Sequence, residues 1–334
     1  MVRCPIALAC AALGVLAAPP AGAACTFTVQ PIPVTMVGPR PTVTVTIKGR
    51  PAHFLLDSGA AMNAISAELA ADETAGISKW LIPTIPAVLM GAGGKRVYAA
   101  RVIAPEIQFL GETFRDQMFT VSPRLGAVDG LLGQSMLRQM DVEYDLRGGV
   151  IRLVKTHSCK TTDMTYWVKE GQSYTKIPLT WLDRLDPHAA AEIVINGQKM
   201  QATFDTGSPI TFITRAAAAR AGVKVTDPGV IPIGKGGGID SDFDAWAATF
   251  EDVRIGDEVI RNAPMEIGDT RTDRFDVLLG ADFFLSHHVY VSQSQSRIYI
   301  AYEGGPAFRG PPVRPFRFQA VPPAAASASP APAR

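Results

Sequence analysis

Short segments in which apolar and polar residues alternate recur along most of the chain. This period of two is typical of half-buried β-strands, and glycine and proline residues separate the segments. The strands predicted in the first half are 42–47, 53–56, 96–103, 117–121 and 150–154. Helical segments are few and short, for example 66–71 and 135–140. The pattern therefore predicts a mainly β fold.

The second half of the chain repeats the order of the first. A hairpin turn is expected at Asn196-Gly197, and a short helix at 215–221 is followed by Gly222, a common residue after a helix C-terminus. The strands predicted in this half are 191–195, 200–204, 245–250, 253–255, 259–260 and 297–302. Residues 160–175 are polar without clear periodicity, which places the boundary between the halves there.

The two ends of the chain have compositions of their own. Arg3 precedes an almost entirely apolar run, and the small residues around Ala23 suit a signal peptidase. The run of about 13 residues is shorter than the roughly 20 that a membrane-spanning helix needs. We therefore expect residues 1–23 to be a signal peptide, with no stable membrane span after cleavage; an uncleaved anchor is the alternative. Residues 303–334, rich in Pro, Ala and Ser, are expected to be a disordered tail.

Composition and charge narrow the possible functions. The chain has 334 residues, of which 47% are hydrophobic and 19% charged, as in ordinary globular proteins. Its formal net charge is +1, and without Arg3 the basic and acidic residues balance, so the sequence offers no electrostatic basis for binding nucleic acid. His287 and His288 are adjacent, so on a strand they face opposite ways, and no third ligand is apparent. We expect no metal and no cofactor.

Cysteine usage agrees with export to an oxidising compartment, the periplasm or cell envelope. Cys4 and Cys10 lie in the predicted leader, so the mature chain keeps Cys25 and Cys159. Two cysteines in such a compartment most often form a disulfide. This one would tie the mature N-terminus to the end of the first half. A catalytic thiol or metal ligand is the alternative, but neither residue has a neighbouring Cys or His at ligand spacing.

One motif occurs once in each half. The two copies are Phe-Leu-Leu-Asp-Ser-Gly-Ala at 54–60 and Ala-Thr-Phe-Asp-Thr-Gly-Ser at 202–208, 148 residues apart. Each copy is followed at nearly the same distance by an aspartate, an apolar pair and a glycine, at 129–133 and 276–280. A single Asp-Ser/Thr-Gly could be an ordinary turn. Two matched copies with matched downstream segments indicate duplicated domains.

This arrangement resembles the pepsin and retropepsin clan of aspartic peptidases, particularly bacterial envelope members with two retropepsin-like halves. The resemblance covers roughly residues 27–302. It implies a two-lobed acid protease fold that arose by tandem duplication, with lobes at 26–160 and 173–302. It also implies that Asp57 and Asp205 form the catalytic pair.

The resemblance extends to the residues around the pair. It assigns the support of the active-site loops to Ser58, Gly59, Thr206, Gly207, Ser208, Gly133 and Gly280. Within this set, the hydroxyls of Ser58 and Thr206 would lock the two loops together. We further hypothesise that the Ser208 hydroxyl hydrogen-bonds an ionised Asp205, because such a bond favours the charged form. Asp57 would then be the partner that is more often protonated.

Members of the clan cover their substrate with a β-hairpin flap. The candidates here are Gly93, Gly94 and Tyr98 in the first half, and Gly236 and Gly237 in the second. Glycine-rich tips suit a hairpin that opens and closes. Which of them is the working flap stays open, and either could be an ordinary surface loop.

The chemistry of two adjacent carboxyl groups also follows from first principles. Held close together, they share one proton, so the ionised group can take a proton from water while the protonated group polarises a carbonyl. Each half supplies one carboxyl, so a monomer is expected and neither lobe should work alone. The sequence predicts an aspartic endopeptidase acting on envelope proteins or peptides. The alternatives are a non-catalytic peptide-binding protein and a hydrolase of another envelope amide.

Overall fold

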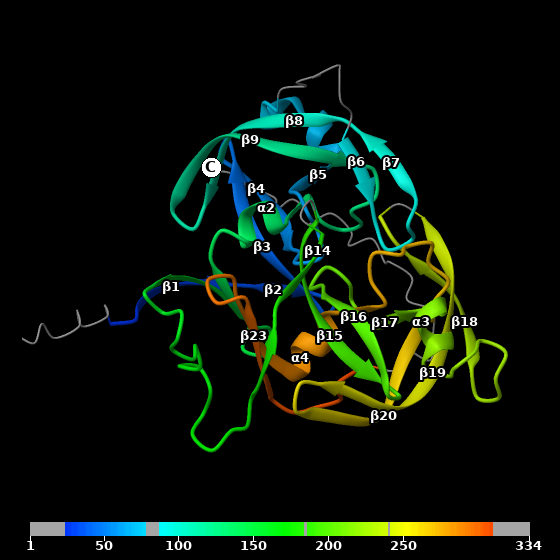
Figure 1. Ribbon diagram of the computed structural model, residues 1–334. Coiled ribbons are helices and arrows are strands. Elements are labelled where there is room, and N and C mark those ends of the chain that lie inside the picture. The colour runs from blue at the N-terminus through cyan, green and yellow to red at the C-terminus, as the bar shows by residue number, and fades with distance from the viewer. Residues whose placement is uncertain (1–23, 78–86, 184–185, 240, 310–334) are drawn as a thin grey trace, which may run out of the picture.

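The computed structural model describes residues 24–77, 87–183, 186–239 and 241–309, and β-strands dominate it (Figure 1). The strands form three large sheets and one separate two-stranded hairpin in these residues. Two of the large sheets each belong to one half of the chain, and the third contains strands from both. The predicted mainly β, two-lobed fold is confirmed.

The first lobe is built on a seven-stranded sheet of order β2-β3-β4-β10-β5-β9-β8, and β3 also pairs with β8. Because β3 reaches both β4 and β8, the sheet curls toward a barrel. Its strands are β2 (Thr35–Val37), β3 (Arg40–Ile47), β4 (Arg50–Leu56), β5 (Ala64–Ser66), β8 (Arg101–Phe109), β9 (Glu112–Ser122) and β10 (Gly130–Leu132). Its helices are α1 (Ala67–Ala71), the 3-10 turn η1 (Glu73–Ala75) and α2 (Gln134–Leu137).

The second lobe repeats this topology in an eight-stranded sheet of order β14-β15-β16-β21-β17-β20-β19-β18. The run β4-β10-β5-β9-β8 corresponds to β16-β21-β17-β20-β19, with the same parallel and antiparallel pairings. Its strands are β14 (Thr180–Asp183), β15 (Asp186–Ile195), β16 (Gln198–Phe204), β17 (Phe212–Thr214), β18 (Ile231–Gly237), β19 (Asp242–Ile255), β20 (Glu258–Gly268) and β21 (Val277–Leu279). Its helices are α3 (Arg215–Arg220) and α4 (Ala281–Ser286).

A six-stranded sheet joins the lobes, in the order β1-β12-β11-β22-β23-β13. The strands are β1 (Thr26–Pro33), β11 (Asp141–Asp145), β12 (Val150–His157), β13 (Thr175–Pro178), β22 (His287–Ser292) and β23 (Arg297–Tyr302). The lobes meet where β11 pairs with β22, with Val142 opposite Val291. Since both residues are buried in one continuous core that includes residues of the two lobes, the halves are packed as one body.

Four short strands were not predicted from the sequence, all for the same physical reason. β5, β10, β17 and β21 have three residues each, and every one of those residues is buried. A strand that is buried on both faces is continuously apolar and shows no alternation. These four strands lie in the middle of the lobe sheets, so the pattern missed the centre of each lobe. It also missed strands outside that centre, among them β1, β11, β13 and β22.

Several predicted boundaries differ from the structure. The helix expected at 135–140 is α2, which ends at Leu137. Residues 303–309, expected to belong to the disordered tail, pack on the second lobe instead: Phe308 is only 2% exposed and stacks on Phe283, while the Arg309 N–H donates to Asp282 Oδ2 at 3.0 Å. A buried aromatic ring supplies the apolar area that a Pro/Ala-rich segment lacks. The rest of the predicted tail and the predicted signal peptide lie outside the described residues.

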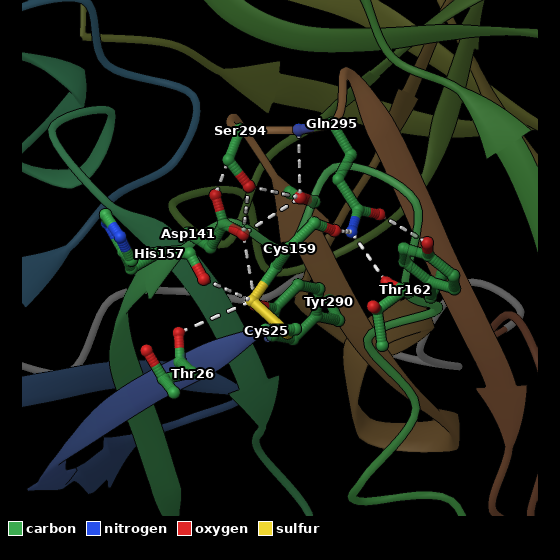
Figure 2. The surroundings of a disulfide bond; sticks show 11 residues. Cys25, Thr26, Asp141, His157, Cys159, Thr162, Tyr290, Ser294 and Gln295 are labelled. Atoms are coloured by element: carbon green, nitrogen blue, oxygen red, sulfur yellow. Dashed lines mark hydrogen bonds between the residues drawn. A yellow bond between two sulfur atoms is a disulfide. The ribbon is translucent and has the colours of Figure 1, made fainter. Parts of the chain in front are cut away.

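Cys25 and Cys159 form a disulfide, as predicted. It fastens the residue before β1 to the segment after β12, next to the hydrogen bonds between Asp141 and Ser294 (Figure 2). Cys159 is buried. The bond therefore secures the outer edge of the six-stranded sheet, where β1 has only β12 as a partner among the described strands.

Replacing both cysteines, Cys25→Ser with Cys159→Ser, is expected to lower the free energy of unfolding by about 2–4 kcal/mol. The disulfide links residues 134 positions apart, and opening so long a loop raises the entropy of the unfolded chain. Denaturant unfolding of the mature chain measures the effect. Adding a thiol reductant should lower the parent to the same midpoint and leave the variant unchanged; equal midpoints for oxidised parent and variant would contradict the prediction.

Candidate active site

The two motif aspartates occupy equivalent places at the ends of two equivalent strands. Asp57 follows β4 and Asp205 follows β16. Their N–H groups donate to the carbonyls of Leu132, at 2.9 Å, and of Leu279, at 2.8 Å, which end the neighbouring strands. Since β4 is parallel to β10 and β16 is parallel to β21, each aspartate lies at the same end of its sheet as the glycine that follows the neighbouring strand. The duplicated sequence therefore becomes two symmetric loops.

These loops meet, and each carboxyl group lies against the glycine of the other loop. The space that a β-carbon at Gly59 would take is filled by the Asp205 carboxyl, and the space beside Gly207 is filled by the Asp57 carboxyl. Glycine is needed at both positions for lack of room. The two carboxyl groups also hydrogen-bond each other. The structure thus brings together Asp57 and Asp205, which the sequence places 148 residues apart.

The hydroxyl residues Ser58 and Thr206 interlock the loops with four buried hydrogen bonds. The Ser58 Oγ accepts from the Thr206 N–H at 2.9 Å and donates to the Phe204 carbonyl at 2.8 Å. The Thr206 Oγ1 accepts from the Ser58 N–H at 3.0 Å and donates to the Leu56 carbonyl at 2.6 Å. Both residues are almost completely buried. Every bond crosses from one lobe to the other, so the relative position of the two carboxyls depends on this exchange.

The two carboxyl groups titrate as a coupled and asymmetric pair. Desolvation, the charge of Asp205 and a hydrogen bond with Asp205 raise the pKa of Asp57 well above its ordinary value. Desolvation also raises the pKa of Asp205, but the Gly207 N–H, Asp57 and the nearby His188 oppose that rise. Asp57 is therefore the partner that keeps the proton, and Asp205 is the partner that ionises first.

The sequence also predicted Asp57 as the more often protonated partner. The reason, a hydrogen bond from the Ser208 hydroxyl to Asp205, was wrong. The Ser208 hydroxyl donates to the Ile210 carbonyl at 2.8 Å rather than to Asp205. It is the backbone N–H of Ser208 that reaches Asp205 Oδ1, at 3.1 Å, together with the Gly207 N–H at 2.8 Å. Asp57 Oδ1 accepts the corresponding Gly59 N–H at 2.9 Å. The shape of the loop, and not its hydroxyl, makes the second site richer in donors.

The downstream glycines lie beneath the loops, as expected. A β-carbon at Gly133 would come within 2.5 Å of the Ala60 carbonyl oxygen, and one at Gly280 would overlap the backbone of Ile210. Their N–H groups donate to Asn63 Oδ1 at 2.9 Å and to Thr211 Oγ1 at 3.0 Å. Asn63 and Thr211 were missed from sequence. Both stand six residues after the motif aspartate, so an alignment of the two halves could have found them.

Two hairpins carry the predicted flap glycines. Gly93 and Gly94 lie between β6 (Ala87–Met90) and β7 (Arg96–Ala99), which form a sheet of their own (Figure 1). The Arg271 N–H of the second lobe donates to the Gly93 carbonyl at 3.3 Å. Tyr98 of β7 is 72% exposed. The hairpin thus extends from the first lobe and touches the second, as a cover over the space between the lobes would.

The second hairpin is built differently. Gly236 and Gly237 are the last residues of β18, which extends the eight-stranded sheet by pairing with β19. Beside its turn, Arg124 of the first lobe forms an ion pair with Asp242 at 2.7 Å. This hairpin is continuous with its lobe, whereas the β6–β7 hairpin forms its own sheet. The geometry favours β6–β7 as the moving element.

Two basic residues near the carboxyl pair were also missed from sequence. Arg40 opens β3, and His188 lies in β15. The negative charges of Asp57 and Asp205 act on both of them and raise their pKa values, although desolvation, the larger effect, lowers each pKa below its ordinary value. Both residues stand 17 positions before the motif aspartate of their lobe. The repeat could therefore have indicated them.

The structure gives no support for a metal site. Within the described ranges, no group of three or more His, Cys, Asp and Glu residues could hold an ion. His287 Nε2 lies 2.9 Å from Glu258 Oε1, and His288 Nε2 lies 3.0 Å from Glu143 Oε1. Both rings are buried, so each of these histidines is already paired with a carboxylate, and that of Glu143 is buried as well. Among the helices of the described segments, none is long and apolar enough to cross a membrane.

Comparisons with known proteins agree in each lobe. The family model described as a gag-polyprotein aspartyl protease matches residues 43–139, and the model described as aspartyl protease matches residues 191–283. The crystal structure of an aspartic proteinase from Irpex lacteus is 13% identical and covers 82% of this chain and 97% of its own, with a TM-score of 0.52. This likeness shows the fold. A search of curated proteins found no match.

A second solved structure matches a smaller part of the chain. It is a retropepsin-like aspartic protease from Rickettsia conorii, 20% identical, covering 32% of this chain and 82% of its own, with a TM-score of 0.27. Each half of the chain thus matches an aspartyl protease family model of its own, which agrees with the internal repeat.

Proposed function

We propose that this chain is an aspartic peptidase whose Asp57 and Asp205 hydrolyse peptide bonds of proteins or peptides in the periplasm or cell envelope, because each half matches an aspartyl protease family model. The observation that carries this proposal is the pair of loops locked face to face, with each carboxyl packed against the glycine of the other. Both acidic groups and both interlocking hydroxyls are present, so no part of the site is degenerate.

The roles of the two carboxyl groups follow from their unequal pKa values. The ionised Asp205 takes a proton from a water molecule, whose oxygen attacks the peptide carbonyl carbon. The protonated Asp57 donates to the carbonyl oxygen, which would otherwise gain a full negative charge. When the tetrahedral intermediate collapses, Asp205 passes the proton that it took from water to the leaving nitrogen, the carbon–nitrogen bond breaks, and Asp57 takes its proton back from the oxygen. One chain supplies both groups, so we propose that the enzyme acts as a monomer.

The proposed compartment rests on the disulfide and the expected leader. Disulfides form and persist in oxidising compartments, and Cys25 with Cys159 forms one here. The expected signal peptide at 1–23 would deliver the chain there. Protein segments outside the cytoplasm are then the accessible substrates.

The direct test is a peptide-library digestion with the mature chain. We expect internal cleavage that needs no added metal and is inhibited by a statine-type transition-state mimic. Products identified by mass spectrometry would give the sequence preference. Binding of peptides without any cleavage would instead establish a receptor, and cleavage of peptidoglycan stems but not of proteins would establish another amide hydrolase.

The plot of kcat/KM against pH should be bell-shaped. Activity needs a protonated Asp57 and an ionised Asp205. As the pH rises through the upper apparent pKa of the pair, Asp57 loses its proton and the rate falls; as the pH falls through the lower one, Asp205 gains a proton and the rate falls. Because the pKa of Asp57 is raised well above its ordinary value, the alkaline limb should lie above the usual carboxyl range. Measuring kcat/KM against pH checks this, and a rate that keeps rising in alkali would contradict it.

A further inference from the structure

His188 reaches from the second lobe to the active-site loop of the first. It lies in β15 and is 8% exposed. Its Nε2 lies 2.6 Å from the carbonyl oxygen of Gly59. A carbonyl oxygen only accepts hydrogen bonds, so Nε2 carries the hydrogen and the imidazole donates. This contact adds a side chain of the second lobe to the four bonds made by Ser58 and Thr206.

Gly59, whose carbonyl His188 holds, also supports both carboxyl groups. The Gly59 N–H donates to Asp57 Oδ1 at 2.9 Å, and its α-carbon lies against the Asp205 carboxyl. A shift of this residue would move the donor away from Asp57 and change the surface on which Asp205 rests. His188 is therefore linked through Gly59 to both acidic groups, to Asp57 by a hydrogen bond and to Asp205 by packing.

The repeat gives His188 a counterpart. Arg40 occupies the equivalent position in the first lobe. It lies 148 residues before His188, the same separation as between Asp57 and Asp205. The charges of both aspartates act on both basic residues. A guanidinium stays charged at all ordinary pH values, whereas an imidazole titrates near neutrality. Helix α2, which packs against β15, carries no titratable side chain. Asp57 and Asp205 are the groups whose charges act on His188.

We propose that His188 is a positioning residue of the carboxyl pair: its hydrogen bond to the Gly59 carbonyl holds the residue whose N–H orients Asp57, and its protonation in acid gives the second lobe a cation that matches Arg40. This rests on the proposed catalytic role of Asp57 and Asp205. A cation near two carboxyl groups favours their ionised form, so a protonated His188 keeps Asp205 ionised to lower pH.

Two substitutions separate the hydrogen bond from the charge. Leucine at this position has neither a donor nor a charge, and glutamine has a donor without a charge. We expect His188→Leu to lower kcat by about 10- to 100-fold, the effect of a small misplacement of a catalytic group, with a smaller change in KM. His188→Gln should recover most of the lost kcat. Both variants should move the acid limb of the pH–rate profile to higher pH.

His53→Gln is the matched control. His53 is an exposed histidine on β4, and its side chain makes none of the hydrogen bonds found in the site. The control should keep the kcat and the acid limb of the parent. Equal losses of kcat in His188→Leu and His188→Gln, with an unmoved acid limb and lower melting temperatures, would show a merely structural role and overturn the proposal. So would a His188→Leu variant with the parent's kcat and profile.

An NMR titration keeps this test independent of the proposed function. In nitrogen-15 spectra of the imidazole rings, His188 should be protonated at Nε2 when neutral. Its pKa should fall in Asp205→Asn, because a negative charge near the ring is lost. If the parent cleaves no peptide, the proposed function fails but this titration still decides the placement of His188. A His188 pKa that is unaffected by Asp205→Asn overturns the inference.

Discussion

Asp57→Asn and Asp205→Asn are each expected to lower kcat for peptide hydrolysis by at least about 10³-fold, which is within the range for loss of a general acid or base. Asparagine has nearly the shape of aspartate but neither gives nor takes the proton. The double variant should be little worse than either single variant, because the two groups act as a unit. Progress curves on one cleaved peptide, read at the optimum pH of the parent, provide the measurement.

The same variants should be at least as stable as the parent at neutral pH. The folded protein raises the pKa of both groups, so their ionisation disfavours the folded state. Such a group contributes stability below its unfolded pKa, and this contribution is lost as the pH rises through its folded pKa. Asparagine does not ionise, so the variants should not lose this stability as the pH rises. We therefore expect a melting temperature above that of the parent at pH 7 and no difference in strong acid.

Asp116→Asn is the matched control for this experiment. Asp116 is exposed in β9 and has a φ of 52°, a backbone conformation that asparagine adopts readily. It should leave both kcat and the melting temperature unchanged. If Asp57→Asn or Asp205→Asn retained substantial activity, the shared-proton mechanism would be wrong, since it needs one carboxyl from each lobe.

Thr206→Ala should destabilise the protein by about 2–5 kcal/mol and lower kcat as well. The Thr206 hydroxyl is fully buried and serves two backbone groups of the first lobe, the Ser58 N–H and the Leu56 carbonyl. Removing it leaves both without partners, at about 1–3 kcal/mol each. The two loops would also lose part of their alignment, and a misplacement of about 1 Å can reduce a rate by about 10²-fold. Denaturant unfolding and kcat give the two measurements.

Thr206→Ser separates the hydroxyl from the rest of the side chain. It keeps both hydrogen bonds and loses one buried methyl group, at about 1 kcal/mol. The first lobe already uses serine at the equivalent position, Ser58. We therefore expect Thr206→Ser to retain nearly the full kcat. Equal activity and stability in the alanine and serine variants would mean that the interlock does not hold the site together.

The acidic pair was predictable because its signal is local and occurs twice. A glycine two residues after each aspartate, an apolar strand before it and an apolar pair with glycine further on are all visible along the chain. The same holds for the Ser58 and Thr206 hydroxyls and for Gly133 and Gly280. All of these residues can be found without knowing how the two lobes are arranged, once the duplication is recognised.

The errors concern contacts that depend on direction. The Ser208 hydroxyl was expected to bond Asp205, but it turns to the Ile210 carbonyl. Its orientation depends on the local turn, which residue type alone does not specify. Phe308 lies in a segment whose composition predicts disorder, yet it is buried against Phe283. A single aromatic residue can anchor such a segment if a partner is in place.

The sequence by itself determined that the chain is duplicated, mainly β and equipped with one acidic loop per half, because periodicity and spacing are properties of the chain read along its length. Only the tertiary structure decided which groups face one another across the lobes. It placed His188 on the Gly59 carbonyl, joined β11 to β22, and packed each carboxyl against the glycine of the other loop. The physical reason is that hydrogen bonds and desolvation depend on distances of a few ångströms between residues about 130 to 150 positions apart, and such distances exist only once both lobes are packed.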